Sequence, residues 1–140
     1  MVKIRSMSML LGLLILGLLL PPTVPVVQGG PSPSRIIDLF AEGPQPRRLT
    51  IAVGTVVVWN SHLAPTKLFV TTVTFQAGRQ VAQATMPVAG YNGFILEGEH
   101  YVGRMEGNGG QVALRFATPG EYTYTVDHQK HLGGVIVVKE

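Results

Sequence analysis

Residues 116–138 decide the fold. They read Phe116-Ala-Thr-Pro-Gly-Glu-Tyr-Thr-Tyr-Thr-Val126, then Asp127-His128-Gln-Lys-His131-Leu132-Gly-Gly, then Val135-Ile-Val-Val138. Side chains alternate between the two faces of a strand, so Tyr122, Tyr124 and Val126 share one face. A turn at Pro119-Gly120 precedes them, and the Tyr122 hydroxyl is a candidate to bond nearby backbone at this corner. The run Val135–Val138 is apolar throughout, which predicts a closing strand covered on both faces.

Short runs of β-branched and aromatic residues, separated by turn residues, continue upstream. They predict strands at Arg35–Phe40, Leu49–Val53, Thr55–Trp59, Leu68–Phe75, Gln80–Thr85, Phe94–Leu96, Tyr101–Arg104, Gln111–Phe116 and Glu121–Val126. No segment of this part has a helical period, and Trp59 is predicted to pack in the core. The predicted fold is therefore all-β, an antiparallel Greek-key β-sandwich.

The N-terminus has the pattern of a secretory signal. Lys3 and Arg5 precede an uncharged, Leu-rich stretch at residues 7–20, followed by prolines and small residues. We predict a signal peptide at residues 1–29, a linker at residues 30–34 and one domain at residues 35–140. If the segment is retained, it would instead anchor the domain to a membrane. Either case predicts export, to the periplasm, the extracellular space or the outer face of the membrane.

The composition and motifs of the chain argue against several classes of function. The chain has no cysteine, so it can form no disulfide. Loss of Lys3 and Arg5 with the signal lowers the formal net charge from +3 to +1, and no basic stripe remains to bind nucleic acid. A Gly-x-Ser-x-Gly nucleophile motif is absent, and we expect no enzymatic activity.

Two segments resemble the cupredoxins, a family of small β-sandwiches that hold one copper ion. The first is Thr50–Asn60, with its Gly-Thr-Val-Val-Val-Trp-Asn run, followed by the loop to Pro65-Thr66. The second is the Tyr-x-Tyr strand with the histidine-bearing loop after it. The resemblance implies a cupredoxin-like sandwich. It also implies ligand positions at Thr66, Val126, either His128 or His131, and near Leu132, in place of the family's His, Cys, His and Met.

Three of these four positions depart from the family pattern. A type-1 copper site needs two imidazoles and a thiolate, which Thr66, Val126 and Leu132 do not supply. We therefore expect no type-1 copper and no cofactor. In a cupredoxin-like sandwich, however, His62, His128 and His131 would lie at the same end, and with Asp127 they are candidates to bind copper or zinc without a thiolate. The competing interpretation is that they are solvent-facing loop histidines, and His100 is expected to be exposed.

Three functions remain open from the sequence. The leading hypothesis is an exported cupredoxin-like binding or accessory domain that contacts a protein partner or an envelope complex. It would meet the membrane itself only if the N-terminal segment is retained. The second is a non-blue copper- or zinc-binding protein that uses the loop histidines. The third is an immunoglobulin-like adhesion or assembly domain, whose Pro-Gly-x-Tyr corner would arise from shared sandwich physics.

Overall fold

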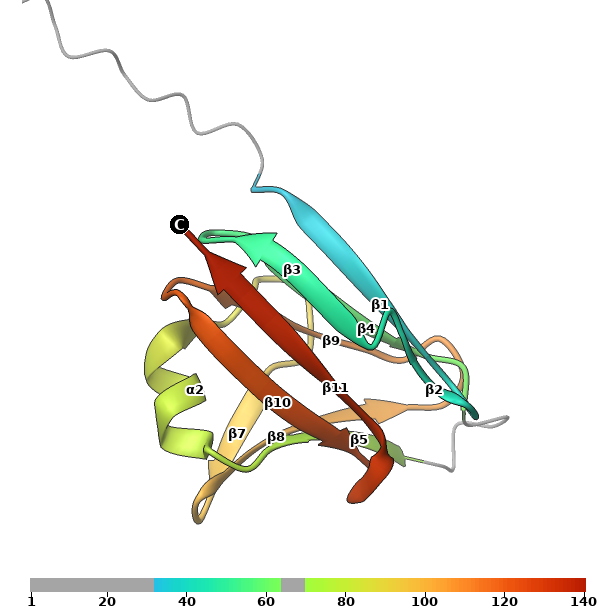
Figure 1. Ribbon diagram of the computed structural model, residues 1–140. Helices are drawn as coiled ribbons and strands as arrows, with labels where there is room; N and C mark the ends of the chain where they lie inside the picture. The colour runs from blue at the N-terminus through green and yellow to red at the C-terminus, as the bar shows by residue number, and fades with distance from the viewer. Residues whose placement is uncertain (1–31, 64–69) are drawn as a thin grey trace, which may run out of the picture. The chain divides into compact units, whose positions relative to one another are not determined.

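The computed structural model describes residues 32–63 and 70–140. The predicted signal peptide, the first residues of the predicted linker, and Thr66 lie outside these ranges. Within them the chain forms a sandwich of two β-sheets, shown in Figure 1. The first sheet has the order β2 (Gly43–Gln45), β1 (Ser34–Phe40), β4 (Val56–Ser61), β9 (Gln111–Phe116) and β6 (Thr85–Met86). The second has the order β3 (Arg48–Ala52), β11 (Gln129–Lys139), β10 (Gly120–Val126), β5 (Val70–Phe75), β8 (His100–Glu106) and β7 (Phe94–Glu97).

The all-β sandwich prediction is confirmed, but its antiparallel description needs correction because both sheets are mixed. β1 pairs in parallel with β4, and β11 pairs in parallel with β3. The chain crosses from the first sheet to the second between β2 and β3, and crosses back before β4. β4 therefore returns beside β1 running in the same direction. Alternation of side chains is the same in parallel and antiparallel strands, so the sequence pattern did not contain this information.

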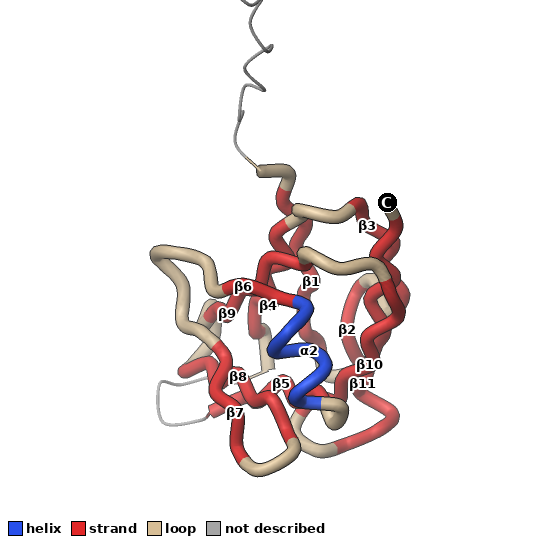
Figure 2. Tube along the Cα trace, turned by 90° about the vertical axis from the view of Figure 1, so that its left-hand side faces the viewer, coloured by secondary structure: helices blue, strands red, loops and turns tan. Residues whose placement is uncertain are grey.

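The predicted strand at Gln80–Thr85 is wrong, because most of this segment is helix α2 (Gly78–Ala84). Val81 and Ala84, three residues apart, are both buried, as on one side of a helix. The helix starts tightly against the turn between β7 and β8. A Cβ on Gly78 would lie 2.3 Å from the Glu99 carbonyl oxygen, so glycine is needed there. Figure 2 shows α2 from the side, alongside the two sheets.

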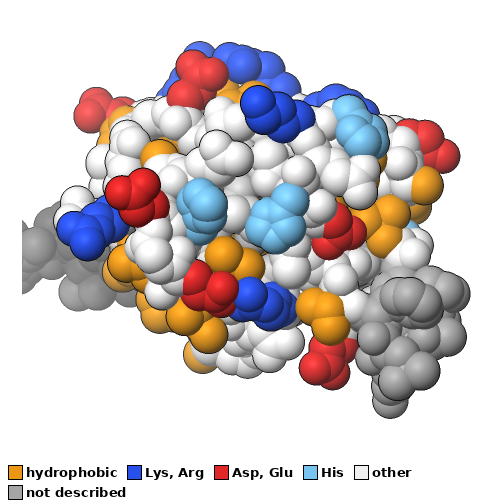
Figure 3. Space-filling model, turned by 90° about the horizontal axis from the view of Figure 1, so that it is seen from below, with side chains coloured by type: hydrophobic (Ala, Val, Ile, Leu, Met, Phe, Trp, Pro, Cys, Tyr) orange, Lys and Arg blue, Asp and Glu red, His pale blue; other side chains and the backbone are white. Residues whose placement is uncertain are grey.

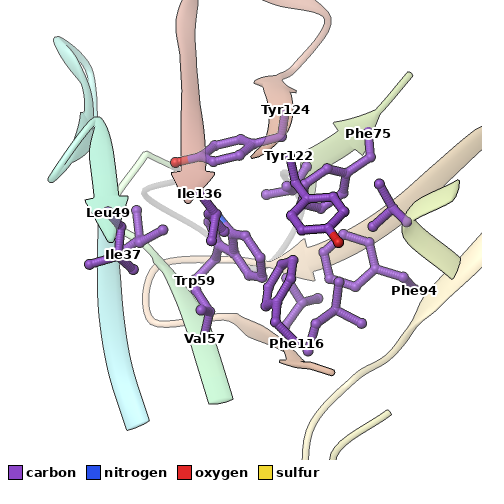
Figure 4. Close-up of a cluster of buried hydrophobic side chains, with 14 of the residues drawn as sticks. Ile37, Leu49, Val57, Trp59, Phe75, Phe94, Phe116, Tyr122, Tyr124 and Ile136 are labelled. Carbon is purple, nitrogen blue, oxygen red and sulfur yellow. The ribbon is translucent and has the colours of Figure 1, made fainter. Parts of the chain in front are cut away.

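Apolar side chains from both sheets fill the space between them. Trp59 is fully buried and packs edge-on against Phe75, Phe94 and Tyr124, with ring centroids 5.5–5.9 Å apart. Figure 4 shows these rings with aliphatic side chains such as Ile37, Leu49 and Ile136 around them. Aromatic pairs in this orientation add to the stabilisation that burial alone gives. The prediction that Trp59 lies in the core is confirmed.

The closing strand and the tyrosine face are also as predicted. β11 lies between β3 and β10, in the interior of the second sheet. Tyr122, Tyr124 and Val126 are buried in the core, and Thr123 on the opposite face is exposed. The hydroxyl of Tyr122 donates a hydrogen bond to the Thr118 carbonyl oxygen at 2.7 Å, which closes the corner before β10. In residues 32–63 and 70–140 we find no helix of the length and apolarity needed to span a bilayer.

We expect Tyr122→Phe to destabilise the domain by about 0.5–1.5 kcal/mol, the usual net value of one hydrogen bond. The ring stays in the core, and only the bond to the Thr118 carbonyl is lost. Urea unfolding followed by fluorescence would measure the difference. Tyr91→Phe is the matched control, because Tyr91 is 40% exposed and should give no change. Equal midpoints for wild type and Tyr122→Phe would show that the corner bond adds nothing.

Candidate functional site

The loop expected to carry copper ligands is a tight turn. β10 and β11 are joined through the pair Val126↔Gln129, which leaves only Asp127 and His128 between the strands. Both have positive φ, +50° and +60°, the combination found in type I′ hairpin turns. Asp127 ties the turn to β5: its Oδ1 accepts from the Thr72 N–H at 2.8 Å, and its own N–H donates to the Thr72 carbonyl at 2.9 Å. His128 lies at an exposed position on this turn.

A bulge follows the turn on the β11 side. The register passes from Val126↔Gln129 to Tyr124↔Gly134, so the four residues Lys130–Gly133 lie opposite Thr125 alone. The guanidinium of Arg47 holds this bulge: its Nη1 donates to the His131 carbonyl at 2.8 Å and to the Gly133 carbonyl at 3.3 Å. Its Nη2 donates to the Glu42 carbonyl in the turn between β1 and β2. The His131 side chain is exposed, whereas Leu132 in the same bulge points into the core.

Hydrocarbon occupies two of the positions where the cupredoxin resemblance places ligands. Val126 is 1% exposed and Leu132 is 7% exposed, and both belong to the main core cluster. Val126 pairs with Val73 of β5, which is also fully buried. Side chains of this kind offer no lone pair to a metal ion. The sequence-based interpretation of Val126 as an inward-facing core residue is confirmed.

His62 lies in a separate cluster at the end of β4, made of Asp38, Phe40, Asn60 and His62. We call it the His62 cluster. His62 Nε2 is 2.9 Å from Asp38 Oδ1, and the ring stacks on Phe40 with centroids 4.6 Å apart and planes 10° apart. Asn60 Nδ2 donates to the same Asp38 oxygen at 3.2 Å. The parallel pairing of β1 with β4 sets Asp38 beside Asn60 and so assembles the cluster.

The structure does not gather His62, His128 and His131 into one site. Among the described residues, no three His, Cys, Asp or Glu side chains lie close enough together to hold a metal ion. Figure 3 views the molecule from below and shows histidines set between acidic and basic side chains on the surface. His62 has an aspartate and an asparagine for neighbours. Metal binding by these histidines stays the alternative hypothesis, and His100 is exposed as expected.

The phenol of Tyr124 is deeply buried in the core beneath this turn and bulge. Tyr124 is 1% exposed, and its hydroxyl has no hydrogen-bond partner among the described residues. Burial raises the pKa of Tyr124 far above its usual range; the Trp59 indole and the charge of Arg47 oppose this shift more weakly. A Cβ on Gly134 would lie 2.5 Å from the Tyr124 hydroxyl oxygen, so glycine opposite this ring is required. Burial raises the pKa of Tyr122 as well.

These shifts predict a loss of stability at alkaline pH. A phenol whose pKa is raised by folding keeps its proton in the folded state, while the unfolded chain loses it above pH about 10. The contribution of Tyr124 to stability is therefore complete below that pH and is lost as the pH rises further. Tyr124→Phe should match wild type to within about 1 kcal/mol at neutral pH, since its hydroxyl has no partner.

The measurement is the urea midpoint of wild type and Tyr124→Phe across neutral to alkaline pH. We expect the variant to lose less stability than wild type above pH about 10, with a remaining slope from Tyr122. Identical alkaline slopes for the two proteins would contradict the burial of this phenol.

Sequence reasoning missed Arg47 and the neighbours of His62. Arg47 follows a Pro/Gly-rich turn segment in the sequence, and no motif marks a guanidinium that donates to three carbonyl oxygens. Asp38 and Phe40 lie more than twenty positions before His62 in the chain. Their proximity depends on the parallel register of β1 and β4, which strand alternation does not predict.

Comparison with known proteins supports the fold. No protein-family model matches the chain, and no curated protein matches it in sequence. Several solved structures do match, and the first are variants of amicyanin. One, a methionine-to-alanine variant in the Cu(I) state, has a TM-score of 0.54 and 20% identity, over 76% of this chain and 82% of that one. A second methionine-to-alanine variant in the Cu(I) form has a TM-score of 0.55 and 20% identity, covering 79% and 87%.

A reduced Cu(I) proline-to-glycine variant of amicyanin at pH 4 gives a TM-score of 0.53 and 21% identity, over 81% of this chain and 86% of that one. Structural similarity at this level of sequence identity shows a shared backbone arrangement only. These matches agree with the two-sheet sandwich described above. The chain therefore has a cupredoxin-like fold.

Proposed function

We propose that the chain is an exported cupredoxin-like domain that binds a protein partner, as an accessory or envelope-complex subunit, and has no type-1 copper site. The observation that supports this most is the filled ligand end. Val126 and Leu132 are packed in the core, and the turn at Asp127 and His128 leaves no extended loop between β10 and β11. If this end of the sandwich holds no metal ion, its surface residues are available to contact a protein partner.

The surface we propose for the partner is the His62 cluster. Phe40 is 37% exposed, and the side chains of His62 and Asp38 are 36% and 38% exposed. Aromatic residues are enriched at protein interfaces, whereas charged groups such as Asp38 are found mainly at the rim. The cluster also sits on the ends of β1 and β4, which are held in register by the sheet, so its groups are preorganised.

Site-specific photo-crosslinking in the native host tests this proposal. A benzophenone amino acid at Phe40 should give one discrete crosslinked product, and the same probe at Thr50 should give none. Thr50 is the matched control because it is also exposed but lies on β3 in the other sheet. The partner found from Phe40 should also dissociate when Phe40→Ala is introduced. Crosslinking from Thr50 alone, or from neither position, would contradict the proposal.

Export is the second part of the proposal, and the sequence pattern of Lys3, Arg5 and the following apolar stretch supports it. N-terminal sequencing of protein from the native host should find a start between Val27 and Pro31. An intact Met1 on protein that needs detergent for solubility would show that the segment is retained as a membrane anchor and is not cleaved. An intact Met1 on protein from the cytoplasmic fraction would overturn export.

A further inference from the structure

A groove lies on the outer face of the second sheet, on the side of β10 and β11 that faces away from the core. Its volume is about 730 Å³. Gln76, just before α2, and Gln80, within it, line the groove on one side, and Arg48 of β3 with Lys130 of β11 lines it on the other. Figures 1 and 2 both show α2 running beside β10. This volume falls in the range of pockets that bind small molecules, about 300–1,000 Å³.

The floor of the groove is recessed because the side chains that form it are short or, at a glycine, absent. Thr123 and Val135 form a cross-strand pair on this face, and next to them the bulge contributes Gly133. A Cβ on Gly133 would lie 2.4 Å from the Tyr124 carbonyl oxygen, so packing requires glycine here. The Arg47 hydrogen bonds to the His131 and Gly133 carbonyls hold the bulge in place. The floor of the groove is thus built into the sheet.

The groove carries an excess of positive charge. Arg48 and Glu121 form an ion pair at 3.5 Å, whereas the Arg47 guanidinium donates to backbone carbonyl oxygens, which do not neutralise its charge. Lys130 lines the groove and has no carboxylate within ion-pair distance among the described residues. Ala77, Val81 and Val135 add apolar surface to the same walls. The charge and the apolar surface together select for an anion with an apolar body.

From this we infer that the groove is a binding site for a small aromatic carboxylate. The carboxylate pairs with the Lys130 ammonium, and the ring lies over Thr123 and Val135 between the two walls. The carboxamides of Gln76 and Gln80 are in the groove to bond a second polar group of the ligand. This site is on β10, β11 and α2, apart from the His62 cluster on the first sheet. The two proposals are independent, because the groove and the His62 cluster share no residue.

Fluorescence titration with anilinonaphthalene sulfonate, an aromatic anion, gives the first measurement. We expect saturable binding of one dye per native domain, and displacement of the dye by benzoate but not by benzyl alcohol. Benzyl alcohol has nearly the same size and ring but no charge. The full mature domain is used, and circular dichroism confirms that each variant is folded.

Two variants and one control locate the site. Thr123→Trp fills the floor from an exposed strand position and should abolish saturable binding. Lys130→Gln should weaken dye and benzoate binding roughly two- to fivefold, the scale of one partly exposed charge pair. Lys139→Gln removes a cation from the same strand outside the groove and should leave binding unchanged.

Three outcomes of the titrations with wild type and Thr123→Trp would overturn the inference. They are the absence of saturable binding, binding that survives Thr123→Trp, and equal competition by benzyl alcohol and benzoate. Loss of affinity in Lys139→Gln equal to that in Lys130→Gln would also overturn it, because net charge alone would then explain the effect.

Discussion

Trp59→Ala should destabilise the domain by about 3–5 kcal/mol, the largest effect that we expect from a single substitution in this chain. The indole is fully buried at the centre of the core and has three aromatic neighbours, Phe75, Phe94 and Tyr124. Its removal loses the transfer free energy of a large side chain and leaves a cavity that rigid sheets cannot close. The free energy of unfolding in urea, followed by circular dichroism, measures this loss.

Ile95→Ala is the control for this substitution. Ile95 lies on the edge strand β7 and is 63% exposed, so its truncation should change stability by about 0.5 kcal/mol or less. A loss for Trp59→Ala as small as that for Ile95→Ala would mean that the indole does not lie between the sheets. The packing of the whole core would then need revision.

Val126→Ala should cost about 1–3 kcal/mol, because it removes buried methyl groups and leaves a partial cavity. Val126 is 1% exposed and pairs with the buried Val73. Val70→Ala, at a 49% exposed position on the adjacent strand β5, should have little effect. The two denaturant midpoints therefore compare a buried with an exposed valine. If Val126→Ala leaves the midpoint unchanged, the position implied for a thiolate is not filled, and the account of the ligand end fails.

Strand alternation was enough to predict the parts of the fold that lie in a single strand. It placed Tyr122, Tyr124 and Val126 on the inner face, and the apolar run Val135–Val138 in the interior of a sheet. The turn residues Pro119 and Gly120 predicted the corner at which the Tyr122 hydroxyl bonds the Thr118 carbonyl. These features depend on neighbours in the sequence, which is why local patterns reveal them.

Features that depend on contacts between distant segments were not predictable in the same way. The helix at Gly78–Ala84 packs against β6 and β8, and its Val81 and Ala84 join the core. A seven-residue segment is too short for its period to be decisive. The parallel pairing of β1 and β4 follows from a chain crossing between sheets. The groove depends on the β11 bulge and on Arg47, which joins three segments through backbone carbonyls.

The candidate site also combines features that local sequence predicts with features that depend on how the chain folds. The sequence identified which ligand positions lack ligands, because that requires only residue types at Val126 and Leu132. It could not give the spacing of the histidines, because this depends on how the chain turns after Val126. The turn uses only Asp127 and His128, and the extra residues form a bulge in β11. His131 thereby becomes an exposed strand residue, while His62 packs on Phe40 in the first sheet.

The copper content of the domain tests the central claim most directly. The purified protein is loaded with Cu(II), passed through a desalting column, and examined for bound metal and for visible absorption, beside His128→Ala and His131→Ala. We predict less than one bound copper per domain, the same low content in all three proteins, and no intense visible band, because no thiolate is present. One tightly bound copper per domain that is lost in His128→Ala or His131→Ala, or an intense blue band, would contradict the account.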